Sequence, residues 1–331
     1  MSRWSISPRC EDALAHRSPK AAKLVRKPTR RRLGQYSHRV DRTEPESAEM
    51  LRTVGGEPND IALRANRPQS LIITIYGAYS RTMGGWLSVA TLLTLMGEVG
   101  IEDAAVRSAL SRFKRRGILV AERRGNTAGY ALSENAWRTF DVGDARVLQR
   151  REPPAASGWI LAAFSIPERS RDIRYRLRSR LARVGFAQVA GGLWIAPRSL
   201  EADVRYIVEV LGVHEHVNIF GADHVGFGST AEAVRQWWDL DEIASQYSAF
   251  TETYRRVGSA YDSGSRIAST AAFADYTRIL TSWRPLPYID PGLPREFLPR
   301  VWAGDEATDL FYSLHDRLFQ IAQHHVEDLA S

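Results

Sequence analysis

Arginines and serines gather on one face of a helix that the sequence predicts between residues 101 and 117. On a helical wheel, with about 100° per residue, Val106, Leu110 and Phe113 form a narrow apolar stripe. The opposite face carries no acid, and its polar residues are Arg107, Ser108, Ser111, Arg112 and Arg115. Small residues allow close approach to a duplex, while guanidinium and hydroxyl groups reach phosphates and base edges. This face therefore predicts a helix that enters the major groove of DNA.

A basic hairpin is predicted directly after this helix. Residues 118–121 and 129–132 have strand-like sequences, and the turn between them, 122–128, contains Arg123 and Arg124. A helix followed by a hairpin and preceded by short helices indicates a winged helix-turn-helix. The alternative is a solvated basic helix beside an ordinary hairpin. We favour DNA binding because the helix face and the hairpin are basic together.

Neighbouring helices must hold this surface in place. Apolar residues recur at helical spacing over 71–79 and 89–96, and a turn over 97–101 separates the second helix from the arginine-bearing one. A further helix over 133–150 leads out of the unit, and Pro153-Pro154 marks a linker. We therefore expect a DNA-binding domain over residues 66–150.

The pattern after the linker changes to alternating strands and helices. Strands are predicted over 159–166, 186–190, 193–196 and 216–225, and helices over 171–184 and 200–211. This βαββαβ order predicts a ferredoxin-like domain over 155–228, which we expect to pair two subunits. Its first helix is rich in arginine and could touch DNA, but such a helix more commonly exposes a charged face to solvent. Residues 229–331 are predicted to form a helical C-terminal domain, with long helices over 231–254, 267–283 and 305–330. The fold class is thus α+β.

Charge is distributed unevenly along the 331 residues. The net charge is +6 over residues 1–65, +5 over 66–150, +2 over 151–228 and −6 over 229–331. Nucleic acid should therefore meet the front of the chain. Residues 1–65 form a basic extension with the composition of a disordered segment. The single cysteine, Cys10, excludes an intramolecular disulfide, and no apolar run approaches the roughly 20 residues that span a bilayer. We expect a cytoplasmic protein without a membrane partner.

Signals of enzyme or cofactor chemistry are weak. The chain has no nucleophile elbow, no phosphate-binding loop and no dinucleotide fingerprint, so we expect no cofactor and no enzyme activity. His214, His216 and His224 lie close in sequence, and the first two would share a face of an extended strand. A metal site there is conceivable, but we favour unlinked surface histidines.

Four segments resemble the PaaX family of phenylacetate-pathway transcriptional repressors. They are residues 70–119, residues 159–186, GGLWIAPR over 191–198, and DPGLPREFLPRVWAGDEATDLF over 290–311. The resemblance spans about residue 66 to the end and follows the family's order. It implies a dimeric repressor of operator DNA, with a GntR-like winged helix, a ferredoxin-like middle domain and a helical C-terminal domain. By this resemblance, the family's recognition helix corresponds to the segment that carries Arg107, Ser108, Ser111 and Arg112. Its wing corresponds to the hairpin with Arg123 and Arg124.

The same resemblance implies a small-molecule effector, and phenylacetyl-CoA releases the best-known members from DNA. The C-terminal domain is unusually rich in aromatic residues. They could serve core packing, or they could line a pocket for such an aryl or acyl-CoA ligand. The middle domain also resembles a small CRISPR-associated nuclease with a catalytic aspartate at the end of its first strand. Here that point carries Ser165, and Glu168 lies beyond a proline. A metal-dependent nucleic-acid-processing enzyme is therefore the disfavoured alternative.

Overall fold

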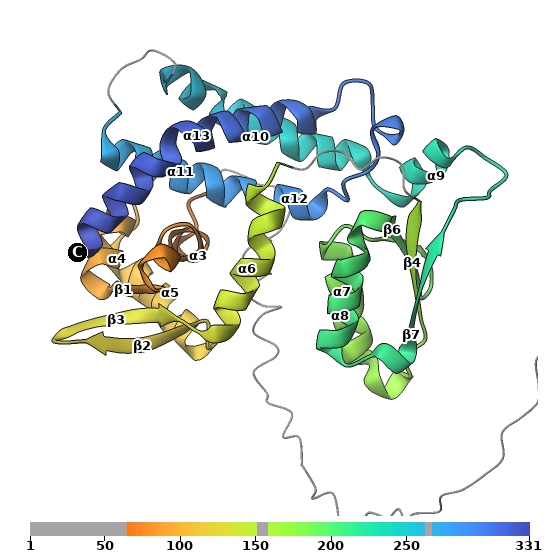
Figure 1. Cartoon of the computed structure of the whole chain (residues 1–331), viewed down its shortest axis with the longest axis horizontal. Coiled ribbons are helices and arrows are strands. Elements are labelled where there is room, and N and C mark those ends of the chain that lie inside the picture. Colours follow the sequence, from red (N-terminus) through yellow and green to blue (C-terminus); the bar gives the residue numbers. More distant parts are fainter. Residues whose placement is uncertain (1–64, 151–157, 262–266) are drawn as a thin grey trace, which may run out of the picture. The chain divides into compact units, whose positions relative to one another are not determined.

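The computed structural model describes residues 65–150, 158–261 and 267–331 (Figure 1). The basic N-terminal extension and the linker around Pro153-Pro154 lie outside the described residues, so the expectations for them stay predictions. Helices and two small antiparallel sheets make up the described chain. The predicted α+β class is confirmed.

The first helices and strands surround the predicted DNA-binding surface. They are α3 (Pro68–Ala78), β1 (Trp86–Ser88), α4 (Val89–Glu98), α5 (Asp103–Arg115), β2 (Leu119–Arg124), β3 (Thr127–Leu132) and α6 (Glu134–Leu148). Pro68 occupies the first turn of α3, where its missing N–H costs no hydrogen bond. Ser88 caps α4 by accepting a hydrogen bond from the Thr91 backbone N–H, and Ser133 caps α6 in the same way. The boundaries thus follow local chemistry.

The hairpin differs from the sequence-based prediction. Strands β2 and β3 pair from Leu119 opposite Leu132 to Arg124 opposite Thr127, which leaves only Gly125 and Asn126 as the loop. Gly125 has a φ of +57°, a conformation that suits glycine in a two-residue hairpin loop. The predicted seven-residue turn was therefore wrong, and both hairpin arginines lie in β2. Strand β1 adds to the other side of β3 and completes a sheet of order β1-β3-β2.

The middle of the chain forms a second sheet covered by two helices on one face. Its parts are β4 (Trp159–Phe164), α7 (Arg171–Arg183), β5 (Ala187–Ala190), β6 (Leu193–Pro197), α8 (Glu201–Leu211) and β7 (Val217–Ala222). The sheet order is β5-β6-β4-β7, and every paired strand is antiparallel. Ile160 and Ala162 of β4 pack with Leu177 of α7 and Val204 of α8 in one apolar cluster. The last strand ends at Ala222, three residues earlier than predicted.

The remaining chain is helical, with one break that the sequence-based prediction missed. Its helices are α9 (Thr230–Trp237), α10 (Leu240–Tyr261), α11 (Ser269–Trp283), α12 (Leu286–Ile289) and α13 (Ala303–Ala330). The predicted single helix over 231–254 was wrong because Trp238 is extended, with a ψ of 137°. Its indole Nε1 donates to the carbonyl of Gly185 at 2.9 Å. Asp239 then starts α10 by accepting from the Glu242 backbone N–H at 2.9 Å.

Helix α3 lies inside a core that it shares with the C-terminal helices. Seven consecutive residues, Ser70 to Tyr76, are buried, which an amphipathic surface helix would not show. The hydroxyls of Thr74 and Thr281 lie 2.6 Å apart, and those of Tyr79 and Thr277 lie 3.0 Å apart. Helix α11 therefore packs directly against α3, and its hydroxyls satisfy the polar groups buried there.

Candidate nucleic-acid interface and effector cavity

Helix α5 has one buried face and one exposed basic face. Val106, Leu110 and Phe113 are buried, with Phe113 fully inaccessible to solvent. All seven predicted DNA-contact residues are exposed: Arg107, Ser108, Ser111, Arg112, Arg115, Arg123 and Arg124. The apolar stripe thus fixes the rotation of the helix about its axis, and that rotation points the arginines and serines of α5 at solvent.

The basic face of α5 is free of internal neutralisation. Within residues 65–150, 158–261 and 267–331, no ion pair involves Arg107, Arg112 or Arg115. The acid within the helix is Asp103, in the first turn, where a negative charge is favourable to the helix dipole. The exposed face therefore offers an uncompensated positive surface, which attracts a polyanion such as DNA.

The two hairpin arginines have different surroundings, because successive side chains on a strand point to opposite faces. Arg124 forms an ion pair with Glu122 at 2.8 Å, and its guanidinium lies over the Trp86 ring at 4.9 Å. Arg123 donates to the Asn126 carbonyl at 3.0 Å across the tight loop. Arg124 is thus engaged within the hairpin by a carboxylate and a ring. Arg123 keeps its charge unpaired by any acid among the described residues.

The turn that precedes α5 is held by the C-terminal helices. Arg278 of α11 donates from Nη2 to the Val99 carbonyl at 2.9 Å. His325 of α13 lies 2.9 Å from the Glu98 carboxylate through Nε2, at the end of α4. These contacts connect residues more than 170 positions apart in sequence. The position of α5 therefore depends on contacts with the C-terminal region, which no local sequence pattern indicated.

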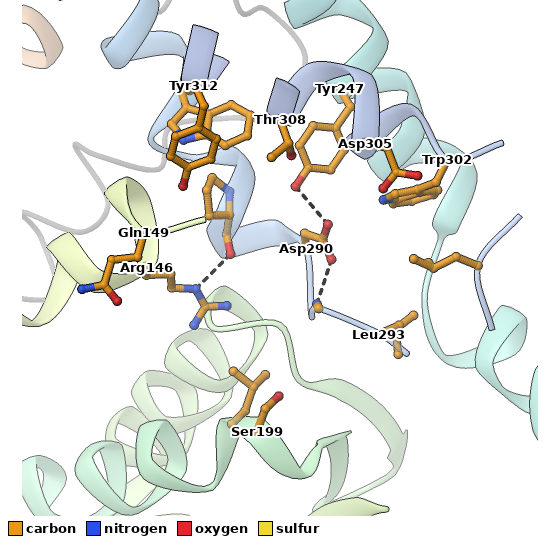
Figure 2. A pocket seen from close by; sticks show the side chains of 16 residues that line it. Arg146, Gln149, Ser199, Tyr247, Asp290, Leu293, Trp302, Asp305, Thr308 and Tyr312 are labelled. Atoms are coloured by element: carbon orange, nitrogen blue, oxygen red, sulfur yellow. Dashed lines mark hydrogen bonds between the residues drawn. The ribbon is translucent and has the colours of Figure 1, made fainter. Parts of the chain in front are cut away.

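A cavity of about 330 Å³ lies where α6, the end of β6 and the C-terminal helices meet (Figure 2). Four aromatic side chains line it: Tyr247, Trp283, Trp302 and Tyr312. The Asp290 carboxylate accepts from the Tyr247 hydroxyl at 2.9 Å and from the Gly292 backbone N–H at 2.8 Å. Aromatic walls with a few convergent polar groups are the usual features of a small-molecule pocket.

Arg146 of α6 forms one side of this cavity and joins three segments of the chain. Its Nε donates to the Pro287 carbonyl at 2.9 Å, and its Nη2 donates to the Val184 carbonyl at 2.8 Å. Its Nη1 lies 3.4 Å from Asp203, and the side chain is almost fully buried. Arg146 therefore links α6 to α12 and to the helices α7 and α8 of the middle unit. Other aromatic residues of the C-terminal helices fill the core instead, including Phe250, Phe273 and Phe311.

The other predicted candidates do not assemble into a site. His214 and His216 lie in a 3-10 turn, so the shared strand face considered for them was wrong. His224 makes its contact with the Thr230 hydroxyl, at 3.2 Å. Glu168 is bound by Arg174 at 2.5 Å. Among the residues that the structure describes, no cluster of three or more metal-binding side chains occurs, and no helix is both long and apolar enough to cross a bilayer.

Comparison with known proteins gives matches along most of the chain. Three family models match consecutive segments: PaaX-like protein over 67–136, PaaX protein central Cas2-like domain over 152–234, and PaaX-like protein C-terminal domain over 238–328. The transcriptional repressor PaaX of Escherichia coli (strain K12) is 26% identical over 253 residues, which cover 75% of this chain and 79% of that protein. A solved structure, the uncharacterized protein Rv0674 from Mycobacterium tuberculosis, is 24% identical with a TM-score of 0.47, covering 80% of this chain and 99% of that one.

Proposed function

The chain belongs to the PaaX family, and we propose that it is a transcriptional repressor that binds double-stranded operator DNA through α5. Similarity to a repressor indicates a regulator rather than an enzyme. The nuclease alternative gains no support, because Ser165 follows the first strand of the middle sheet and Glu168 is paired with Arg174. A regulator of this kind works in the cytoplasm, beside the chromosome.

The order of elements around α5 supports a winged helix-turn-helix over residues 66–150. Helix α4 and helix α5 are joined by a short turn, and β2 and β3 follow as a hairpin that β1 extends to three strands. In this motif the second helix of the pair enters the major groove and the hairpin contacts the backbone beside it. Here α5 takes the first role and β2–β3 takes the second.

The observation that carries the proposal is the exposed, acid-free face of α5. Arg107 and Arg112 have the reach and the paired donors that bind guanine edges or phosphates, while Ser108 and Ser111 keep the backbone close to the groove. Arg115 lies one turn beyond Arg112. Arg123 is the stronger candidate of the hairpin for a phosphate contact, because Arg124 already binds Glu122.

We propose further that two subunits act together on one operator. A homodimer would place two copies of α5 in successive major grooves, about 34 Å apart, on a near-palindromic site. The middle βαββαβ unit is ferredoxin-like in its element order, and we assign dimerisation to residues 155–228. The sheet face away from α7 and α8 carries the exposed side chain of Phe220, which supports a contact there.

The cavity around Tyr247 and Trp302 is our candidate for the effector site, in the helical domain of residues 229–331. At about 330 Å³ it has room for an aryl-acyl group, while the nucleotide part of a ligand such as phenylacetyl-CoA would lie outside. The Asp290 carboxylate also disfavours a phosphate inside. An aromatic effector can release DNA only if it binds the DNA-free arrangement more tightly. The cavity includes Arg146 of α6, so a ligand there touches the helix that follows the hairpin.

Identification of the operator tests the central proposal. Genomic DNA recovered with the full chain should be enriched in a small number of near-palindromic sites. The double variant R107E/R112E should lose this enrichment, because charge reversal repels phosphate, while R171E/R174E on α7 should keep it. If both variants kept the enrichment, or if both lost it equally, the assignment of α5 as the DNA-contacting helix would be contradicted.

The effector proposal is tested separately on the identified operator. Phenylacetyl-CoA should release the protein from DNA, whereas phenylacetate and free CoA at equal concentration should act weakly. The T308W variant, which narrows the cavity, should bind DNA normally and resist release. Equal release of T308W and the wild type would place the effector elsewhere.

A further inference from the structure

A second, smaller cavity lies on the other side of α6. It has a volume of about 50 Å³ and shares no lining residue with the cavity assigned to the effector. Its walls come from α3, α6, α11 and, through Tyr288, α12, and they are mainly apolar, with Ala78, Phe140, Val147 and Leu280 among them. Arg284, which follows α11, also lines it. The cavity thus combines mainly apolar walls with a guanidinium group.

Arg284 is buried with most of its hydrogen-bonding capacity unused. Only 7% of the residue is exposed. Its Nη2 donates to the Ser70 carbonyl at 3.3 Å, a long hydrogen bond, and its Nε has no partner in the described chain. A guanidinium has five N–H donors, so most of them are not accounted for by the protein. Buried polar groups without partners are rare in native proteins and require an explanation.

No carboxylate compensates the charge of Arg284 either. No ion pair involves it among residues 65–150, 158–261 and 267–331. Burial lowers the pKa of Arg284 to about 10, so the group is still protonated at neutral pH. A buried positive charge without a partner is strongly unfavourable. The fold retains it, which suggests that something anionic completes the site.

Asp144, the acid among the described residues of the cavity wall, is already engaged by an arginine outside the cavity lining. Asp144 is bound by Arg81, which also pairs with Asp141 at 3.1 Å. Burial raises the pKa of Asp144, and Arg81 acts against that shift. This group contains two carboxylates and one guanidinium, so it has no positive charge to spare for a second anion. A ligand should carry one negative charge at the Arg284 end and no second one near Asp144.

We propose that this cavity binds a short monocarboxylate, whose carboxylate pairs with Arg284 and whose apolar tail lies against Phe140, Val147 and Leu280. Carboxylate and guanidinium form paired charge-assisted hydrogen bonds, which would use the idle donors. The volume admits roughly three or four water-sized groups, so an acid of about two to four carbons fits and an aryl acid does not. This site is additional to the proposed repressor function and does not depend on DNA binding.

Calorimetry on the full chain tests the proposal with propionate as the probe and propionamide as its neutral match. Propionate should give saturable heat and raise Tm, while propionamide should do neither at the same ionic strength. Acetate and butyrate extend the series. Absence of saturable binding by all three acids into the high millimolar range would overturn the proposal, whatever the variants show. Equal binding of propionamide would also overturn it, because the guanidinium charge would then play no part.

Variants separate a ligand site from a structural role. R284M keeps the length of the side chain and removes the charge, so it should weaken propionate binding at least tenfold while Tm of the free protein stays equal or rises. L148W fills the cavity with Arg284 intact and should lose the propionate response too. R169M, at an exposed arginine of the middle unit, is the matched control and should respond like the wild type. If R284M responded like R169M, or if L148W kept the full response, the assignment would be wrong.

Discussion

Helices α5 and α7 are both 13 residues long and rich in arginine, yet their guanidinium groups have different surroundings. On α7, Arg174 binds Glu168 at 2.5 Å and Arg178 binds Gln188 at 2.8 Å, while Arg180 is buried. On α5, three exposed arginines share no acid within the described chain. Arginines of α7 are therefore engaged by neighbouring side chains, whereas the three arginines of α5 are available to an external ligand.

This difference shows that arginine content alone does not define a nucleic-acid surface. An arginine that already binds a carboxylate or amide has lost part of its attraction for phosphate, and the bond must be broken before DNA can use it. The arrangement of neighbours, with the acid of α5 confined to its first turn, is the reason why we propose α5 rather than α7 as the helix that contacts DNA. Four measurements test the orientation of α5 and its contrast with α7.

The largest effect should come from the buried face that orients α5. Replacement of Phe113 by alanine removes a fully buried ring, so the free energy of unfolding should fall by about 3–5 kcal/mol. Urea unfolding measures this loss. Ser111→Ala, on the exposed face of the same helix, should change it by less than about 0.5 kcal/mol. Similar losses for both substitutions would mean that α5 is not oriented as described.

Single arginine substitutions should have the next largest effect, on DNA affinity. Arg107→Ala and Arg112→Ala should each weaken operator binding by about 1–3 kcal/mol, or about five- to 150-fold, because each removes a base or phosphate contact. Fluorescence anisotropy with labelled operator measures the affinity. Arg171→Ala on α7, also exposed, is the matched control and should bind like the wild type. Wild-type affinity in both α5 variants would contradict their assignment.

The hairpin arginines should differ from each other in the salt dependence of binding. Loss of one phosphate contact in Arg123→Ala should reduce the slope of log affinity against log salt by about 0.9. Arg124→Ala should reduce it less, since Glu122 and Trp86 already engage that side chain. Titration of operator at several salt concentrations gives both slopes. A larger reduction for Arg124→Ala would reverse the roles given to the two residues.

The smallest effect should follow from loss of the ion pair between Arg174 of α7 and Glu168. Arg174→Ala removes an ion pair with a mainly exposed carboxylate, so the free energy of unfolding should change by less than about 1 kcal/mol. DNA affinity should stay at the wild-type level. Chemical denaturation and the anisotropy assay, applied to the same sample, check both statements. A marked loss of DNA affinity would make α7 a second DNA-binding helix and remove the contrast with α5.

Local sequence patterns were enough to predict the local features of the proposed DNA-binding surface. The spacing of Val106, Leu110 and Phe113 set which face of α5 is buried, and this left the arginines and serines exposed. Ser88 and Ser133 marked helix starts, because a cap acts within three residues of its own position. Such features depend on neighbours in the chain, and sequence patterns report them directly.

Other features depend on distant segments and became visible only in the folded chain. Helix α3 is buried on all sides because α11, some 200 residues later, covers it. At the break at Trp238, the indole bonds to Gly185. The larger cavity forms where α6 and the turn after β6 meet the C-terminal helices, and the smaller one forms between α3, α6 and α11. Arg284 looks like any arginine in the sequence. Its burial without a charged partner results from packing, which no local pattern encodes.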